Sequence, residues 1–364
     1  MQYFEHYTSN TTAGSANQLY FAPESEEESC VGRVYYRVYA GGEYHYSFLY
    51  SNVIDSTFDH GNISRANRIL PTWNIHSLRV SVTASADPNM LKSDDMSLVT
   101  FDGKPQKSVL PGMFFSSDPI KLTARADEYI CLEYTFSGSS IPYHEERIIP
   151  AYRLLNGKWT DSAQVPFLGM LGCDRAVSAR IAFWGDSITQ GIGTERNSYT
   201  HWNACVARLL GEKYAYWNLG IGFGRAADAA SLGAWFYKAK HTDVAIVCFG
   251  VNDILQTGNE ELIKESLTTI VKSLKAEGIT VILQTVPPFD YNEEQKTVWE
   301  HVNKYIKEEL STLADAIFDT VPVLGNSETP HMARYGGHPN ATGCAAWAEA
   351  LAPLIQSVIQ KVKL

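Results

Sequence analysis

Ser187, Asn252 and His338 are residues whose types could together carry out acyl transfer. A serine hydroxyl is a weak nucleophile that needs a base within hydrogen-bond reach, and the imidazole of His338 can be that base. The anionic oxygen of a tetrahedral intermediate needs fixed N–H donors, which the Asn252 amide and nearby backbone N–H groups can supply. These residue types therefore predict ester hydrolysis through a serine nucleophile.

Each candidate lies in a short loop next to a predicted strand or helix. Because ligands of open α/β sheets bind where the carboxyl ends of the strands meet, we expect these loops to share one edge of a sheet. Gly-Asp-Ser alone is an ordinary turn sequence, so the prediction depends on all four loops together. They are Gly185-Asp186-Ser187, the glycine loop 218–224 with Gly220, Gly222 and Gly224, the turn Gly250-Val-Asn252-Asp253, and Gly336-Gly-His338-Pro-Asn340.

The second half of the chain alternates apolar runs with helical stripes. The run 244–249 is continuously apolar, which is typical of a strand covered on both faces. Strands that alternate with helices predict a doubly wound parallel sheet. The predicted strands are 179–184, 214–218, 244–249, 280–286 and 316–319, and the predicted helices are 198–210, 261–277, 293–313 and a last helix after the N-cap Asn340.

The first half instead has a period of two, with turn residues between its alternating runs. Tyr44, Tyr46, Phe48 and Tyr50, for example, alternate with polar or small residues. This pattern predicts an antiparallel β-sandwich. We therefore expect an N-terminal accessory or substrate-shaping domain over residues 1–170 and an α/β domain over 178–364. The many tyrosines have two interpretations, a carbohydrate-facing surface or a core filled with large aromatic side chains.

Composition limits the classes of partner. The chain has 364 residues with a net charge of −10, which argues against nucleic acid or an anionic membrane as partner. Its N-terminus lacks a signal-peptide pattern and no apolar run reaches about 18 residues, so we expect a cytoplasmic protein. The six cysteines lack zinc spacing, so we expect no metal and no cofactor. The expected partner is a small soluble ester or an acylated sugar, and a homo-oligomer stays open.

The four loops, in this order, resemble those of the SGNH (GDSL-type) hydrolases. The resemblance covers roughly residues 178–364 and implies a flavodoxin-like sheet that hydrolyses esters, often acetyl or short acyl esters, including those on sugars. It implies Ser187 as nucleophile, His338 as general base and then acid, and an oxyanion hole formed by Asn252, the N–H of Ser187 and the N–H of Gly222 or Gly224. The first half is similar to the β-sandwich, jelly-roll-like, that precedes the hydrolase domain in some members.

Two features depart from the family pattern. Phe223 separates Gly222 from Gly224, so either glycine could face the oxyanion. Tyr335 stands three residues before His338, where the family usually has an aspartate, and a neutral tyrosine cannot stabilise an imidazolium as a carboxylate does. Three outcomes stay open: a Ser–His dyad oriented by a backbone carbonyl, a carboxylate from elsewhere (Glu328 or Asp319), or a weak enzyme. We favour the first two because the other loops are intact.

Other classes of function are compatible with parts of the sequence. A dinucleotide site could use Gly220, Gly222 and Gly224, but it needs an acid after the next strand, and Asp243 precedes that strand. A non-catalytic carbohydrate-binding protein with a degenerate hydrolase domain, or a short-chain lipase or thioesterase, remain the alternatives. Asp186 and Asp253 are predicted to fix their loops. The sequence thus predicts a serine esterase that removes short acyl groups, first of all acetyl groups from a carbohydrate.

Overall fold

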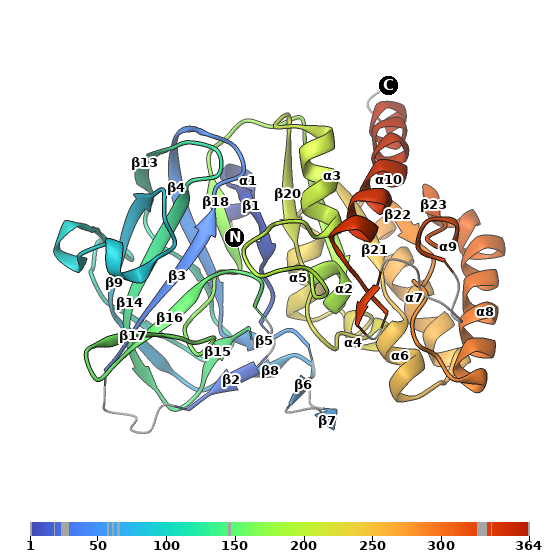
Figure 1. Cartoon of the computed structure of the whole chain (residues 1–364), viewed down its shortest axis with the longest axis horizontal. Helices are drawn as coiled ribbons and strands as arrows, with labels where there is room; N and C mark the ends of the chain where they lie inside the picture. Colours follow the sequence, from blue (N-terminus) through green and yellow to red (C-terminus); the bar gives the residue numbers. More distant parts are fainter. Residues whose placement is uncertain are drawn as a thin grey trace. The chain divides into compact units, whose positions relative to one another are not determined.

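The computed structural model describes residues 2–17, 19–22, 29–56, 58–59, 62–63, 66–144, 147–325, 333–335 and 337–362. The chain divides into two compact units, an N-terminal unit of residues 1–176 and a C-terminal unit of residues 177–364 (Figure 1). The N-terminal unit is rich in strands, and the C-terminal unit alternates strands with helices.

Two antiparallel sheets make up most of the N-terminal unit. In the first, the strand order is β12 (Phe114–Ser116), β4 (Gly42–Ser51), β18 (Met170–Cys173) and β1 (Thr8–Gly14), and β13 (Ile120–Ala124) also pairs with β4. In the second, it is β10 (Ser97–Val99), β9 (Trp73–Thr83), β14 (Tyr129–Gly138), β3 (Cys30–Arg37), β16 (Ala151–Leu155) and β17 (Lys158–Asp161), and β11 (Lys107–Val109) also pairs with β9. The antiparallel β structure predicted for this half is confirmed, whereas the jelly-roll arrangement stays a prediction.

Short elements complete this unit. They are the strand pairs β2 (Leu19–Phe21) with β15 (Ile141–Tyr143), β5 (Val53–Ile54) with β8 (Arg68–Ile69) and β6 (Phe58–Asp59) with β7 (Asn62–Ile63), the helix α1 (Tyr3–His6), and the 3-10 turns η1 (Pro88–Met90) and η2 (Ser93–Asp95).

Tyrosines fill the core of the N-terminal unit. The hydroxyl of Tyr50 on β4 lies 3.0 Å from that of Tyr134 on β14, so side chains of the two sheets meet there. Tyr35, Tyr36 and Tyr46 are buried as completely as these two. Of the two interpretations of the tyrosine-rich strands, core packing therefore holds for these five residues, which present no exposed ring face to a sugar.

The sheet of the C-terminal unit is parallel. Its strands are β19 (Ala179–Gly185), β20 (Tyr214–Asn218), β21 (Val244–Cys248), β22 (Thr280–Gln284) and β23 (Ala316–Phe318), in the order β20-β19-β21-β22-β23. Counted along this unit, the order is 2-1-3-4-5, which is the flavodoxin-like order. All residues of β20, β21 and β22 are buried, as expected for strands covered on both faces. The parallel pairing predicted for the strands of this half is confirmed.

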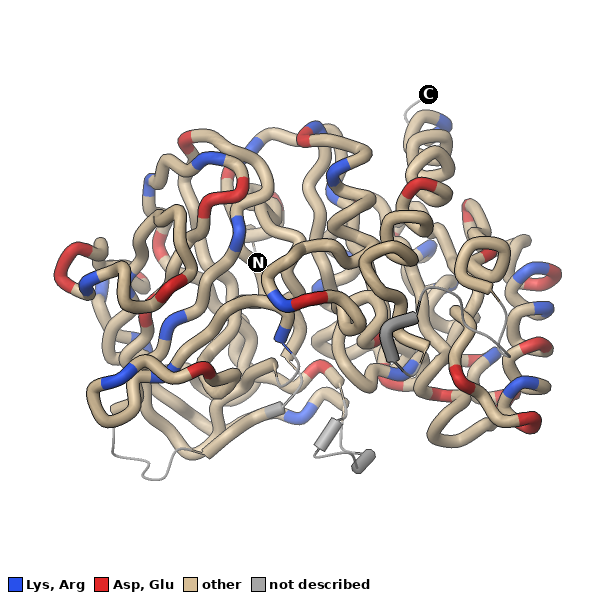
Figure 2. Tube along the Cα trace, viewed as in Figure 1, with Lys and Arg blue, Asp and Glu red and all other residues tan. Residues whose placement is uncertain are grey.

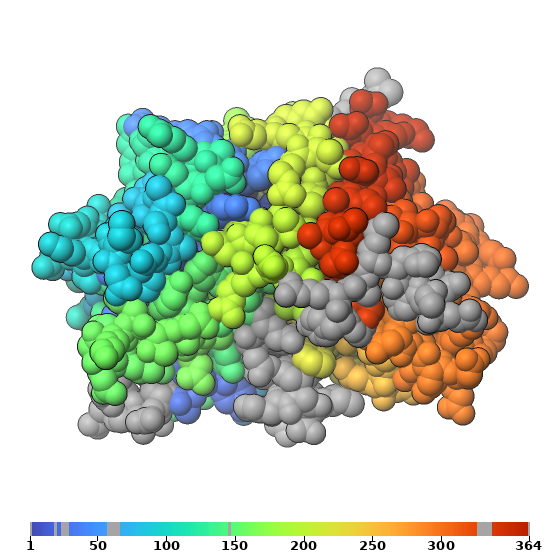
Figure 3. Space-filling view, in the orientation of Figure 1, coloured from blue at the N-terminus to red at the C-terminus, as the bar shows by residue number. Residues whose placement is uncertain are grey.

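Helices connect these strands and cover the sheet. They are α2 (Ser187–Gln190), α3 (Trp202–Leu210), α4 (Ala226–Ala229), α5 (Ala234–Ala239), α6 (Val251–Gln256), α7 (Glu260–Ala276), α8 (Glu293–Glu308), α9 (Val321–Leu324) and α10 (Ala341–Val362), together with the 3-10 turn η3 (Leu310–Thr312) and the strand pair β24 (Ala333–Tyr335) and β25 (His338–Pro339). The surfaces of α3 and α10 adjoin each other, yellow-green beside red in Figure 3. Trp202 of α3 stacks on Trp347 of α10, with ring centroids 4.9 Å apart.

Two predicted helices were too long. The helix expected from residue 198 begins at Trp202, because Ser198 instead closes a local turn by donating its hydroxyl to the Glu195 carbonyl. The helix expected to reach residue 313 ends at Glu308 and is followed by η3. The predicted N-cap of the last helix is confirmed, since Asn340 Oδ1 accepts the N–H of Gly343 at 2.9 Å.

Charged side chains lie at both ends of the outer helices. Helix α7 has Glu260 and Glu261 in its first turn and Lys275 in its last. Helix α8 follows the same pattern, with acids in its first turn and Lys307 in its last, and Figure 2 shows acidic and basic positions interspersed along the helices. This arrangement is the one that the helix dipole favours.

Candidate active site

The turn that carries Ser187 is fixed by its neighbours. Strand β19 ends at Gly185 and helix α2 begins at Ser187, while Asp186 caps that helix by accepting the N–H of Ile188 at 2.9 Å. A Cβ on Gly185 would overlap the side chain of Thr189 and would lie 2.5 Å from the carbonyl oxygen of Cys248. Only glycine therefore fits between the strand and the helix, and Asp186 serves the turn rather than the imidazole.

The structure brings Ser187 and His338 together. Ser187 Oγ lies 2.9 Å from His338 Nε2, although the two residues are 151 positions apart. His338 is in β25, which pairs with β24 so that His338 lies opposite Tyr335 in this short hairpin. The imidazole can thus accept the serine proton directly, which is the first requirement for a Ser–His pair.

Two further residues contact the candidate base, and the sequence did not identify either of them. The ring of Phe289 meets the imidazole of His338 edge to face, with centroids 5.1 Å apart at 76°. Gly193 has φ of +101°, and a Cβ there would lie 2.9 Å from His338 Cβ. The repeated glycines of Gly191-Ile-Gly193 were a signal of this close approach, whereas nothing in the sequence marked Phe289.

The glycine loop packs tightly behind the nucleophile turn. Asn218 Oδ1 accepts the N–H of Gly220 at 2.9 Å, and the Asn218 amide donates to the Gln190 carbonyl at 3.3 Å. A Cβ on Gly220 would overlap the backbone of Gln190, so this glycine is required for packing against α2. Gly222 is buried two residues further along this loop.

Asn252 contacts the last glycine of this loop. Its Nδ2 donates to the carbonyl oxygen of Gly224 at 3.0 Å, and the Gly224 N–H donates to the Ile221 carbonyl at 3.2 Å. Between the two candidate glycines, Phe223 adopts φ of +60°, which is unfavourable for a bulky side chain. Of the two predicted oxyanion glycines, Gly224 is the one whose carbonyl oxygen accepts a hydrogen bond from Asn252.

Two buried carboxyl groups lie in the turns of the site. Asp253 accepts the N–H of Ala226 at 2.8 Å and that of Ala227 at 3.2 Å, so it fixes the start of α4, in agreement with its predicted role. Burial raises the pKa of Asp253 to about 6. Burial, with a smaller contribution from the Asp253 charge, raises the pKa of Asp186 to about 7.

Of the two carboxylates predicted as possible orienting groups for His338, the structure describes only Asp319. Asp319 accepts from Thr285 Oγ1 at 3.1 Å and from the N–H of Val321 at 3.2 Å, which engages it at the end of β22 instead. Glu328 lies outside the described residues, as does Gly336, and the side chain of Tyr335 is not described.

Three further observations concern metal ions, membranes and the cysteines. Within the described ranges, no cluster of three or more His, Cys, Asp or Glu side chains is placed to hold a metal ion. In that same part of the chain, every helix is too short or too polar to cross a membrane. The six cysteines are buried as free thiols.

Residues 183–346 match the GDSL-like Lipase/Acylhydrolase family, so a GDSL-like (SGNH) family domain lies in this part of the chain. The match covers Ser187, Gly222, Gly224, Asn252 and His338 and leaves out the N-terminal unit.

Similar solved structures have low sequence identity. A member of the lipolytic protein G-D-S-L family from Veillonella parvula is 20% identical, with 49% of this chain and 98% of that chain covered and a TM-score of 0.41. A carbohydrate acetylesterase family member from Sinorhizobium meliloti is 17% identical, with 50% and 99% covered and a TM-score of 0.42. The aryl esterase of M. smegmatis is 17% identical, with 50% and 100% covered and a TM-score of 0.39. No curated protein matches the chain.

Proposed function

We propose that this protein is a serine esterase that hydrolyses short acyl esters, with Ser187 as nucleophile and His338 as general base and then general acid. The distance of 2.9 Å between Ser187 Oγ and His338 Nε2 carries this proposal. The acylhydrolase match of residues 183–346 supports the reaction class. Because His338 Nε2 faces the hydroxyl, the imidazole is placed to accept the serine proton in the first step.

The proposed reaction has two steps. Ser187 Oγ attacks the ester carbonyl carbon while its proton passes to His338 Nε2, and the tetrahedral intermediate collapses as His338 returns that proton to the leaving alcohol. Water then attacks the acyl-serine, gives a proton to His338, and releases the carboxylic acid as Ser187 regains its proton. Both steps form an anionic oxygen that must be stabilised.

Three donors are proposed for this oxygen. Asn252 Nδ2 carries two hydrogens, of which one is donated to the Gly224 carbonyl, so the second is available for the oxyanion. The N–H of Ser187, at the start of α2, is the second proposed donor. The third is the N–H of Gly222 or Gly224. The Gly224 N–H donates to the Ile221 carbonyl at 3.2 Å, so it would have to exchange or share that bond to serve the oxyanion.

The limited exposure of the nucleophile supports a small acyl group as the substrate. Ser187 is only 8% exposed, and the Phe289 ring packs against its partner His338, so a short acyl chain needs the least rearrangement to reach the hydroxyl. We propose an acetyl ester of a carbohydrate as the first substrate class, with a short-chain lipase or thioesterase activity as the alternative. The proposed partner is accordingly a small soluble ester or acylated sugar in the cytoplasm, with no cofactor, nucleic acid or membrane required.

The test combines a fluorophosphonate probe with p-nitrophenyl acetate hydrolysis. The wild type should be labelled and active, Ser187→Ala should lose both properties, and the exposed Ser311→Ala should keep both. Absence of labelling and turnover in the folded wild type would contradict the esterase and favour a non-catalytic carbohydrate-binding protein. Acetylated sugars, longer acyl esters and acetyl thioesters, compared by kcat/KM, then identify the substrate class.

A further inference from the structure

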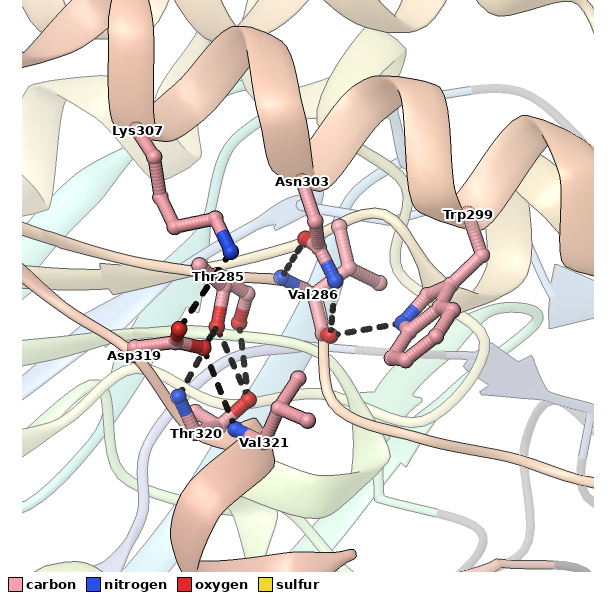
Figure 4. Close-up of polar contacts among 8 residues, drawn as sticks. All are labelled: Thr285, Val286, Trp299, Asn303, Lys307, Asp319, Thr320 and Val321. Atoms are coloured by element: carbon pink, nitrogen blue, oxygen red, sulfur yellow. Dashed lines mark hydrogen bonds and ion pairs between the residues drawn. The ribbon is translucent and has the colours of Figure 1, made fainter. Parts of the chain in front are cut away.

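One buried amide on α8 holds the segment that contacts both halves of the proposed site. Asn303 is 4% exposed and makes two hydrogen bonds with the main chain of Val286 (Figure 4). Its Oδ1 accepts the Val286 N–H at 2.7 Å, and its Nδ2 donates to the Val286 carbonyl at 3.1 Å. Trp299, one turn earlier on α8, donates its indole N–H to the same carbonyl at 2.8 Å. Val286 lies two residues beyond the end of β22, so these side chains replace the strand partner that its main chain lacks there.

Val286 contacts the turn that leads to the proposed oxyanion donor. Gly250 has φ of +126°, and a Cβ at that position would lie 2.6 Å from Val286 Cγ2. Gly250 caps α6, whose second residue is Asn252. The position of Val286 therefore sets where α6 begins and, with it, where the Asn252 amide lies.

Three residues further along, the same segment contacts the proposed base. Phe289 packs its ring against His338, and its main chain abuts Gly337, where a Cβ would lie 2.7 Å from Phe289 Cα. The intervening Pro287 and Pro288 each have a fixed φ, so a shift of Val286 is transmitted to Phe289 rather than absorbed between them.

We infer that Asn303 is a positioning residue that aligns Asn252 and His338 at once, by holding the segment 286–289. This inference rests on the esterase activity proposed above. Thr285, the residue before Val286, is held separately by hydrogen bonds with Asp319 and Thr320. Lys307 belongs to this neighbouring cluster, since its Nζ lies 3.4 Å from Asp319 Oδ2 (Figure 4). Lys307 lies one turn after Asn303 on α8 but is not bonded to Val286, which makes Lys307→Gln a matched control.

The kinetic test measures kcat, KM and the pH profile per active site, with the active sites counted by fluorophosphonate titration. Because a misplacement of about 1 Å can cost about 10²-fold in rate, Asn303→Leu should lower kcat by about 10²-fold with little change in KM. Val286→Ala should lower kcat without moving the pH profile, Phe289→Leu should move the acidic limb of the profile, and Asn303→Leu should do both. Lys307→Gln should match the wild type.

A purely structural Asn303 gives a different result. Asn303→Leu would then lower the melting temperature and the titrated fraction, while kcat per titrated site and the pH profile matched those of Lys307→Gln, and this result would overturn the inference.

If Asn303→Leu does not fold, the separate effects of Val286→Ala and Phe289→Leu on kcat and on the pH profile test the inference instead. Wild-type values of kcat and pH profile in both variants would overturn the inference.

A wild type without Ser187-dependent turnover contradicts the proposed activity but does not by itself contradict the positioning role of Asn303. In that case, NMR decides the positioning role: the side-chain signals of both Asn252 and His338 should shift in Asn303→Leu and not in Lys307→Gln. Unchanged side-chain signals of Asn252 and His338 in Asn303→Leu would overturn the positioning role of Asn303.

Discussion

Gly193 packs so closely against His338 and Pro339 that an added Cβ would lie 2.5 Å from the carbonyl oxygen of Pro339 and 2.9 Å from His338 Cβ. The loop after the nucleophile helix therefore supports the strand that carries the proposed base. Because Gly193 also has φ of +101°, this contact depends on the absence of a side chain.

We expect Gly193→Ala to displace His338 from Ser187 and to lower kcat by about 10²-fold, the loss that a misplacement of about 1 Å can cause. Steady-state kinetics with p-nitrophenyl acetate measure this loss. Gly278→Ala is the control, since Gly278 has φ of +77° with no atom within 4 Å of its added Cβ and carries a similar backbone cost away from the site. Equal kcat values in the two variants would show that the contact with His338 is not needed for activity.

Asn252→Ala should lower kcat by about 10²–10³-fold with a small effect on KM, because it removes a donor needed chiefly in the transition state. Asn252→Asp should be similarly impaired, since an ionised carboxylate cannot donate a hydrogen bond. As a stability control, Asn259→Ala removes the N-cap of α7 and should cost about 1 kcal/mol of unfolding free energy with kcat unchanged. A wild-type kcat in Asn252→Ala would remove Asn252 from the proposed oxyanion hole.

Asp186 should make stability fall as the pH rises. Burial raises its pKa to about 7 in the folded protein, so between about pH 4 and pH 7 the unfolded chain loses this proton before the folded one does. Over that range, the ionisation lowers the unfolding free energy by as much as about 4 kcal/mol, at about 1.4 kcal/mol per pKa unit. Below about pH 4, both states are protonated and this loss is absent.

Asp186→Asn keeps an oxygen for the Ile188 N–H but removes the ionisation, so its urea midpoint should fall less than that of the wild type between pH 4 and pH 7. The exposed Asp94→Asn should follow the wild type. Parallel pH curves for Asp186→Asn and the wild type would contradict the raised pKa.

The N-terminal unit contains a buried ion pair whose disruption should be costly. Arg33 Nε donates to Glu133 Oε2 at 2.7 Å, and both side chains are almost fully buried. Glu133→Gln leaves the guanidinium without its counter-charge and should cost about 3–5 kcal/mol of unfolding free energy, measured by urea titration. Glu43→Gln, which breaks the exposed pair with Lys121, should change it little. A small effect of Glu133→Gln would mean that water reaches Arg33.

Much of the C-terminal unit could be predicted because its local signals agree with one another. Short apolar runs such as 244–248 are typical of strands covered on both faces, and Asn340 is a strong cap signal. The start of α3 could not be predicted, because Ser198 and Thr200 bond each other and their neighbours in a turn that competes with the helix. In the N-terminal half, period two predicts the strands but does not identify which strands pair.

The candidate site was partly predictable for a similar reason. Ser187, Asn252 and His338 are polar residues at strand ends, and glycines mark the turns beside them. Phe289 and Asn303 carry no such signal, because an aromatic residue after two prolines and an asparagine on an amphipathic helix both fit ordinary roles. Their function depends on tertiary contacts that join segments far apart in the sequence, and only coordinates reveal those.

The paired hydroxyls of Tyr50 and Tyr134 also provide an optical signal. Burial raises the pKa of both phenols well above the usual value, so they cannot form tyrosinate in alkali until the N-terminal unit opens. Six of the eight tryptophans, in contrast, lie in residues 177–364. Of the 20 tyrosines, 13 lie in residues 1–176, so the ultraviolet absorbance of tyrosinate should report mainly the opening of the first unit, while indole fluorescence follows mainly the second. One unmodified sample would then yield the order in which the two halves melt.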